Sequence, residues 1–255
     1  MKRLPLYIIL ILLAACTGKP TDFLSGSQVS IYPDYTEITV PSNIAPLNFI
    51  IKDTADKYLT VLEAGGTAVM TGGRKVVIPI RKWRRLTGQG NITVTVFERK
   101  GKEWIRMKPF GIYVSDEVDP YITYRIIPPT FESYQKISIA QRDITCFSEK
   151  TVYSNSRTAS GTDMHCINCH SFRNWHTDNM QFHVRQMMGG TILYTNGHLS
   201  KLNLKTENTI SSGVYPSWHP THDYIAYSTN RTFQNLHTIN TNRVEVFDDE
   251  SDLIL

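Results

Sequence analysis

The sequence predicts a mainly β protein, and two observations carry this prediction. Between residues 28 and 116, short runs rich in β-branched and aromatic residues are separated by glycine-containing turns, and the run 92–96 alternates between apolar and polar positions. Further along, the turn Asn196-Gly197 separates two apolar-rich runs, as in a β-hairpin, because Asn-Gly supplies the positive φ angles of a type I′ turn. With 255 residues, 41% hydrophobic and 20% charged, the chain suits one large domain or two smaller ones, and its composition excludes a wholly disordered protein.

The segment 28–118 has the strand spacing of a β-sandwich. About seven short strands in a segment of this length are typical of the immunoglobulin-like type. The segment holds no pair of cysteines, so the disulfide of antibody domains is not expected there. The expected strands are 29–31, 37–40, 47–51, 58–62, 75–80, 92–97 and 104–107.

The N-terminus has the features of a lipoprotein signal peptide. Lys2 and Arg3 form a positive start, and the apolar run 4–13 is too short to span a bilayer, which needs about 20 residues. The sequence Leu-Ala-Ala-Cys at 13–16 resembles a bacterial lipobox, which implies removal of residues 1–15 and lipidation of Cys16. The alternative is a plain secretory signal with an incidental cysteine.

The segment after the lipobox points to a location. Residues 16–27 are polar with Gly, Ser and Pro, and are typical of a tether. No acidic residue follows Cys16 directly, and by resemblance to bacterial lipoproteins this favours an outer-membrane anchor facing the periplasm. We therefore expect the protein to be attached to the membrane through the lipid at Cys16.

The charge balance argues against a nucleic-acid partner. The formal net charge is +4, and it falls to +2 once Lys2 and Arg3 are removed, far from the basic excess of a nucleic-acid binder. The run 81–85 (Arg-Lys-Trp-Arg-Arg) is a local basic cluster. We interpret it as a solvated turn, with contact to anionic lipid headgroups as the alternative.

The strongest chemical signal is Cys166-Ile-Asn-Cys169-His170. C-x-x-C-H is the pattern of covalent c-type haem attachment. Two cysteines three positions apart lie on one side of a helical turn, where both sulfurs can form thioethers with the haem vinyl groups. His170 is then the proximal iron ligand, and an exported protein is the context in which haem becomes attached.

Three other interpretations of this motif remain open. Zinc could be bound by the two cysteines and His170 with Cys146 or His165 as a fourth ligand, but no second ligand pair of typical spacing is present. A thioredoxin-like redox pair would need a βαβ context. A structural disulfide between Cys166 and Cys169 suits an oxidising compartment. We expect Cys146 itself to be a small buried hydrophobic residue.

A second axial ligand could come from residues 176–188, although a His, a Met or no second ligand are all chemically reasonable. We prefer His183, because strand-like alternation places it on the same face as Arg185, and opposite to Phe182 and Val184. Arg185 could pair with a haem propionate, since a guanidinium suits a carboxylate. The other candidates for the distal ligand are His176, Met180, Met187 and Met188.

Residues 215–230 resemble the repeat of TolB-like, WD40-related (PD40) β-propellers. The tripeptide Pro-Ser-Trp at 216–218 matches the blade pattern, His219 takes the place of its second serine, and His-Asp at 222–223 occupies the turn. Together with the lipobox, the C-x-x-C-H segment and the Phe-His-x-Arg at 182–185, this motif makes the chain similar to a family of Bacteroidota lipoproteins that combine a C-x-x-C-H segment with such a propeller.

The rest of the chain divides into a connector and a partial propeller. Prolines make residues 119–155 less regular, and we interpret 119–188 as an ordered connector with the haem-attachment segment; the resemblance implies the first blade or blades of an incomplete propeller at 189–255. A closed propeller needs at least four blades of about 40–45 residues each. We therefore expect the sequence to be a truncated version of a longer protein.

Two functions follow as expectations. The first is a haem-binding lipoprotein for electron transfer or redox sensing, with a protein redox or envelope partner. The second is a non-enzymatic envelope scaffold, a TolB-like interaction protein whose C-x-x-C-H motif holds zinc or a disulfide. No nucleotide-binding glycine loop and no Ser/His/Asp arrangement stands out, which favours an electron carrier or binding protein over an enzyme.

Overall fold

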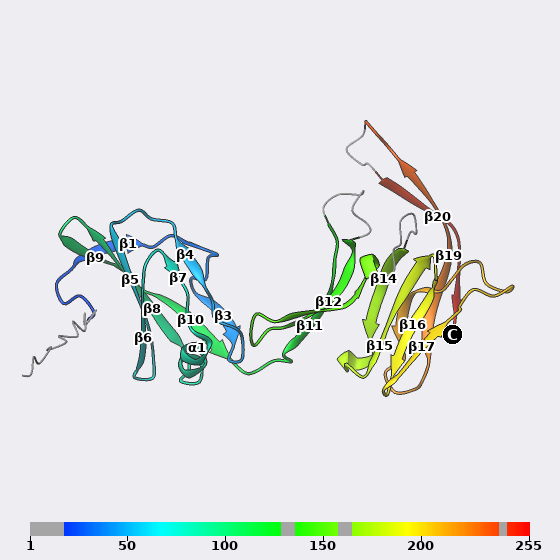
Figure 1. Ribbon diagram of the computed structural model, residues 1–255, viewed down its shortest axis with the longest axis horizontal. Helices are drawn as coiled ribbons and strands as arrows, with labels where there is room; N and C mark the ends of the chain where they lie inside the picture. The colour runs from blue at the N-terminus through cyan, green and yellow to red at the C-terminus, as the bar shows by residue number, and fades with distance from the viewer. Residues whose placement is uncertain (1–17, 129–135, 158–164, 240–243) are drawn as a thin grey trace, which may run out of the picture. The chain divides into compact units, whose positions relative to one another are not determined.

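The structure is a computed structural model that describes residues 18–128, 136–157, 165–239 and 244–255 (Figure 1). The expected signal peptide and Cys16 lie outside the described residues. The described chain is mainly β and forms several sheets, none of which closes on itself, which confirms the predicted class. No described helix is long and apolar enough to cross a membrane. The chain divides into two compact units, the first comprising residues 1–120 and 144–147 and the second 121–143 and 148–255.

The described part of the first unit contains two sheets and one helix. In the larger sheet β8 is central, since it pairs with β5, β9 and β10, and β1, β3 and β6 extend it. The smaller sheet has the order β2-β4-β7. The elements are β1 (Leu24–Gln28), β2 (Ile31–Tyr32), β3 (Ile38–Pro41), β4 (Phe49–Ile51), β5 (Lys57–Ala64), β6 (Thr67–Gly72), β7 (Lys75–Val76), α1 (Ile80–Thr87), β8 (Ile92–Lys100), β9 (Glu103–Lys108) and β10 (Phe110–Ser115).

Both sheets contribute side chains to one hydrophobic core. Ile51 of β4, Leu62 of β5 and Val94 of β8 are all fully buried in it. A second, smaller cluster around Phe97 covers the other side of the large sheet. Because apolar side chains cover both faces of β8, the strand is more deeply buried than its alternating pattern predicted.

The basic run 81–85 forms helix α1, so the predicted turn is wrong. Trp83 and Leu86 are fully buried on one side of the helix, and the Trp83 Nε1–H donates to the Ile44 carbonyl at 2.8 Å. The basic side chains between them are exposed. The spacing of Ile80, Trp83 and Leu86 was the available signal, because apolar residues three apart share a helix face.

The second unit begins with a three-stranded antiparallel sheet where an irregular connector was expected. Its strands are β11 (Tyr121–Ile126), β12 (Ser138–Asp143) and β13 (Glu149–Ser154), in the order β11-β12-β13. Ile139 of β12 is fully buried, and this burial accounts for sheet formation in a segment that prolines interrupt. A short 3-10 helix, η2 (Asn155–Arg157), follows.

A four-stranded antiparallel sheet follows, with the order β14-β15-β16-β17. Its strands are β14 (His165–Phe172), β15 (Asn179–Gln186), β16 (Gly190–Thr195) and β17 (His198–Leu202), with the short 3-10 helix η3 (Arg173–Trp175) between the first two. Asn196 and Gly197 both have positive φ angles between β16 and β17, which confirms the predicted hairpin. Position 188, where the domain boundary was expected, lies in the turn between β15 and β16.

The last sheet contains β18 (Val214–Trp218), β19 (Ile225–Leu236) and β20 (Val244–Ile254), in that order and antiparallel. The core of the second unit lies between the first two of its sheets. Ile137 and Ile139 beside and within β12 pack in one cluster with Ile167 of β14 and with Phe182 and Val184 of β15. The side chains on one face of the β14–β15 pair therefore pack in this core.

Candidate functional site

The C-x-x-C-H motif lies on a β-strand and not on the expected helical turn. It occupies β14, an edge strand that pairs with β15 from His165↔Gln186 to Phe172↔Met180. Ile167, in the middle of the motif, is fully buried in the core cluster. The gain from burying this side chain and from pairing with β15 outweighs the local preference that a short motif has for a turn.

A β-bulge interrupts β14 inside the motif. Asn168 is opposite His183 and Ser171 is opposite Gln181, so Cys169 and His170 together oppose a single residue of β15. The extra residue brings Asn168 and Ser171 to the same face although they are three positions apart. Cys169 has a φ angle of 52°, in the left-handed region. Simple alternation therefore does not determine which face its side chain occupies.

Arg125 of β11 supports this bulge. Its Nη1 donates to the Ile167 carbonyl at 3.3 Å and also to the side-chain oxygen of Asn168. The same Asn168 oxygen accepts the backbone N–H of Cys169 at 3.0 Å. A cationic donor thus satisfies polar groups that the bulge removes from the regular ladder. Sequence reasoning missed Arg125, because nothing local marks it as a partner of residues more than 40 positions away.

The thiols of the motif are free. Cys166 and Cys169 are both half-buried and are not joined in a disulfide. Cys146 is also free and half-buried, and it belongs to the first unit. In the described part of the chain, no group of three or more His, Cys, Asp or Glu side chains is arranged to hold a metal ion. The side chain of His165, the other expected fourth ligand for zinc, is outside the described residues.

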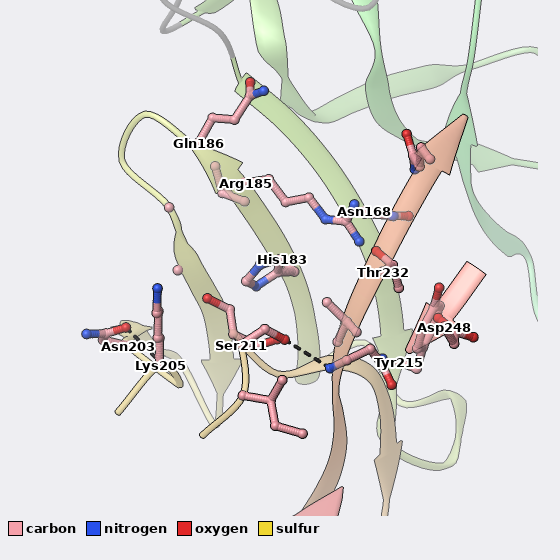
Figure 2. Close-up of a pocket in the computed structure, with 18 of the residues that line it drawn as sticks. Asn168, His183, Arg185, Gln186, Asn203, Lys205, Ser211, Tyr215, Thr232 and Asp248 are labelled. Atoms are coloured by element: carbon pink, nitrogen blue, oxygen red, sulfur yellow. Dashed lines mark hydrogen bonds between the residues drawn. The ribbon is translucent and has the colours of Figure 1, made fainter. Parts of the chain in front are cut away.

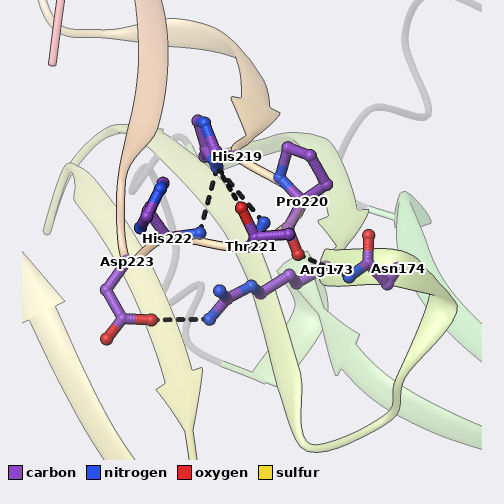
Figure 3. Close-up of polar contacts among 7 residues, drawn as sticks. All are labelled: Arg173, Asn174, His219, Pro220, Thr221, His222 and Asp223. Carbon is purple, nitrogen blue, oxygen red and sulfur yellow. Dashed lines mark hydrogen bonds and ion pairs between the residues drawn. The ribbon is translucent and has the colours of Figure 1, made fainter.

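Residues 173–174, which follow the C-x-x-C-H motif, form an ion pair and a hydrogen bond with the blade-like motif at 216–223 (Figure 3). Arg173 forms an ion pair with Asp223 at 2.6 Å, and the Asn174 side chain donates to the Pro220 carbonyl at 2.8 Å. The Trp218 Nε1–H donates to Ser171 Oγ at 3.0 Å. Two motifs that are about 50 residues apart in sequence are therefore hydrogen-bonded to each other.

His219 holds the turn of the blade-like motif. Its Nδ1 accepts the backbone N–H groups of Thr221 at 3.2 Å and of His222 at 3.0 Å, as Figure 3 shows. The rings of His219 and His222 are 4.7 Å apart. The imidazole of His219 therefore serves as the hydrogen-bond acceptor of this turn, a role that short polar side chains often have.

His183 is buried on the face of β15 that points away from the core cluster, as the alternation predicted. Its side chain is only 5% exposed, and its Nδ1 lies 3.2 Å from Thr191 Oγ1 on β16. Burial lowers the pKa of His183 below its usual value, and the positive charge of Arg185 lowers it further. The imidazole is therefore neutral at pH 7.

A cavity of about 780 Å³ opens beside His183, between β14–β15 and the strands β18–β20 (Figure 2). Asn168, His183 and Arg185 line one side, and Tyr215 and Asp248 line the other. Neither cysteine of the motif lines the cavity, and neither does His170. The described residues that line it are mostly polar: Asn168, His183, Arg185, Gln186, Asn203, Lys205, Ser211, Ser212, Tyr215, Asn230, Thr232, Gln234 and Asp248, with Val184, Gly189, Gly190, Ile210, Val214 and Val246.

His170 and His183 come from neighbouring strands of one sheet. Side chains on neighbouring strands stand roughly perpendicular to the sheet and do not converge on one point from opposite sides. The paired strands β14 and β15 therefore give no support to the distal role of His183. That role stays a prediction.

The other distal candidates lie in different surroundings. Met187 and Met188 are 51% and 55% exposed in the turn between β15 and β16. Met180 packs against the core cluster, and His176 is exposed.

Comparison with known proteins found no match: no family model, curated protein or solved structure is significantly similar to this chain. The fold and site define its class only as a mainly β protein of two compact units, with a C-x-x-C-H edge strand and a polar cavity in the second unit.

Proposed function

We propose that the second unit carries a covalently attached c-type haem, and that the protein is a lipid-anchored electron carrier or redox sensor. The observation that carries the proposal is the C-x-x-C-H motif with both thiols free and half-buried on an edge strand. Thiols that are not joined in a disulfide are what thioether formation with the haem vinyl groups requires. An edge strand has one unpaired side, so it can accept a large group without breaking the rest of the sheet.

The donor set of this strand fits the group. Cys166 and Cys169 would hold the haem through their sulfurs, and His170 would bind the iron as the proximal ligand. Bound there, the group supplies a one-electron redox change. Arg125 and Asn168 hold the backbone of the motif in place, and Arg185 is the candidate partner for a propionate.

Exposed apolar side chains beside the motif support the proposal. Cys166 is paired with Arg185, so the turn carrying Met187 and Met188 lies at the same end of the hairpin. At the other end, Trp175 is 89% exposed. A porphyrin attached at the motif would cover part of this exposed apolar surface.

The architecture within the proposal follows the sequence resemblance. The first unit would be an immunoglobulin-like sandwich that separates the haem unit from the membrane. The antiparallel order β14-β15-β16-β17 is that of a propeller blade, which supports a TolB-like origin for this sheet. The lipid at Cys16 would anchor the chain to the periplasmic side of an outer membrane.

The test is haem attachment in vivo. We expect the full chain, produced in a periplasm with c-type maturation, to keep haem after denaturation and to give a c-type pyridine haemochrome spectrum. Cys166→Ala and Cys169→Ala should each weaken this covalent signal, and the double variant should abolish it. Cys146→Ala is the matched control and should keep it. Colourless wild-type protein under these conditions contradicts the proposal.

A second candidate is a non-enzymatic envelope scaffold. The full integration of β14 into a sheet, with hydrogen bonds from Arg125 and Trp218, favours a structural motif. The same preparation separates the two candidates, because a scaffold would be colourless and would contain bound zinc or a Cys166–Cys169 disulfide.

A further inference from the structure

The cavity beside His183 is lined by neither cysteine of the motif and not by His170, although Arg185, the candidate propionate partner, lies in its wall. Its volume of about 780 Å³ lies within the usual range of small-molecule sites. Three separate parts of the second unit line it: the β14–β15 strands, the segment 203–215, and β19–β20. The site therefore depends on the tertiary fold of this unit and not on one loop.

The charges around the cavity favour a single negative charge on the ligand. Among the described lining residues, the cations are Arg185 and Lys205 and the one carboxylate is Asp248. Neither cation forms an ion pair within the described chain. With His183 neutral, one net positive charge remains. A monoanion with a carboxylate group matches it, since a guanidinium binds a carboxylate with two parallel hydrogen bonds.

The remaining lining groups favour a ligand rich in hydroxyl groups. Amide side chains such as Asn168 and Gln234 and hydroxyl side chains such as Thr232 both donate and accept hydrogen bonds. His183 also lines the cavity, and its Nδ1 lies 3.2 Å from Thr191 Oγ1. Its other ring nitrogen, Nε2, can form a hydrogen bond with a ligand hydroxyl.

Tyr215 adds an aromatic surface at the rim. It is 67% exposed, and its φ angle of 52° lies in the left-handed region, within a bulge of β18. This conformation is unfavourable for a bulky residue and is typical of positions held for a function. The exposed ring beside hydroxyl and amide groups suits the apolar face of a sugar ring.

From this geometry we propose that the cavity binds a small monoanionic sugar acid. Arg185 and Lys205 hold its carboxylate, while His183 and the amide and hydroxyl side chains bind its hydroxyl groups. Tyr215 packs on the face of its ring. The site uses neither cysteine and not His170, but it shares Arg185 and His183 with the haem proposal.

The test uses the full chain, purified in detergent from cells without c-type haem maturation, so that its outcome does not depend on the haem proposal. D-glucuronate is the probe in isothermal titration. D-glucose, which lacks the carboxylate, and acetate, which lacks the hydroxyl groups, are the comparison ligands. We expect one glucuronate per chain, bound at least about tenfold more tightly than either comparison ligand.

Single substitutions locate the site. Lys205 is exposed, so the fold should tolerate its substitution, and Lys205→Gln should weaken glucuronate binding about tenfold. Arg185→Gln should weaken binding by the same factor or more. Lys150→Gln, an exposed lysine of β13 outside the cavity, is the matched control and should leave binding unchanged. Absence of glucuronate binding, equal binding of acetate, or equal losses in Lys205→Gln and Lys150→Gln would overturn the proposal.

Discussion

At the scale of single residues, the motif depends on a partner outside it. Cys169 adopts a left-handed backbone conformation. The side-chain oxygen of Asn168 accepts hydrogen bonds both from the Cys169 N–H and from Arg125. The bulge is therefore stabilised by a charge-assisted hydrogen bond from another sheet. Removing that donor would leave partly buried acceptors unsatisfied.

We expect Arg125→Gln to destabilise the second unit by about 1.5–3 kcal/mol, the usual contribution of a hydrogen bond to a charged group. Urea unfolding, followed by tryptophan fluorescence, measures this change in the free energy of unfolding. Arg231→Gln is the control, because Arg231 is half-exposed and pairs with Asp249 and Glu250 at the surface. The control should cost less than about 1 kcal/mol, and equal effects would contradict the supporting role of Arg125.

His183 makes stability depend on pH. Burial and Arg185 lower its pKa in the folded protein below the usual value of 6.5, so the unfolded chain binds more protons in that range. Stability due to this group is therefore fully present above pH 6.5 and is lost as the pH falls toward the lowered pKa. We expect His183→Gln to reduce the loss of melting temperature between pH 7.5 and pH 5, values chosen to bracket the ordinary histidine pKa of about 6.5.

The control for this experiment is His198→Gln, which changes an exposed histidine of β17. The variant should melt with the pH dependence of the parent protein. A parent-like pH dependence in His183→Gln would show that burial of this imidazole does not contribute to acid sensitivity.

At the scale of elements, side chains of the motif at 216–223 bind the end of β14 and the residue that follows it. Trp218 donates to Ser171, and Arg173 pairs with Asp223, so the strand with the two cysteines is fastened by residues about 50 positions away. Because β14 pairs with only one neighbouring strand in its sheet, these side-chain contacts limit its local opening.

We expect Trp218→Phe to raise the reactivity of Cys166 and Cys169 toward a thiol reagent, in haem-free protein, by roughly fivefold. The substitution removes one neutral hydrogen bond of about 1 kcal/mol while retaining most of the aromatic surface, and the loss favours the open strand. Cys146, in the first unit, is the internal control and should react at its original rate. Unchanged rates at all three cysteines would contradict the fastening role of Trp218.

At the scale of the whole molecule, the two largest hydrophobic clusters of the described residues lie in different units. The first is built from strands β2 to β10 and α1 around residues such as Leu62 and Trp83, and the second from β12, β14 and β15 around Ile167. Their memberships do not overlap. Each unit is therefore expected to unfold as its own cooperative transition.

We expect Leu62→Ala to lower the stability of the first unit by about 2–5 kcal/mol, because it removes a fully buried side chain and leaves a cavity. The transition of the second unit, followed by the exposure of Cys166 and Cys169, should not move. Calorimetry on the same samples resolves both transitions. A parallel shift of the second transition would mean that the two units unfold together.

The sequence alone determined the local features of this protein. It predicted the β class, the Asn196-Gly197 hairpin, and the alternation that places Phe182 in the core and His183 on the other face. These features depend on backbone preferences and on strand periodicity, which a few neighbouring residues encode. The C-x-x-C-H pattern is likewise local, and its haem remains a prediction.

Only the tertiary structure decided the features that depend on distant partners. Burial of Trp83 made a helix of the basic run, and burial of Ile167 with pairing to β15 made the cysteine motif a bulged strand. The polar cavity likewise combines side chains from three segments. Long-range pairing and burial contribute more free energy than local propensity does, and for that reason the sequence pattern did not reveal them.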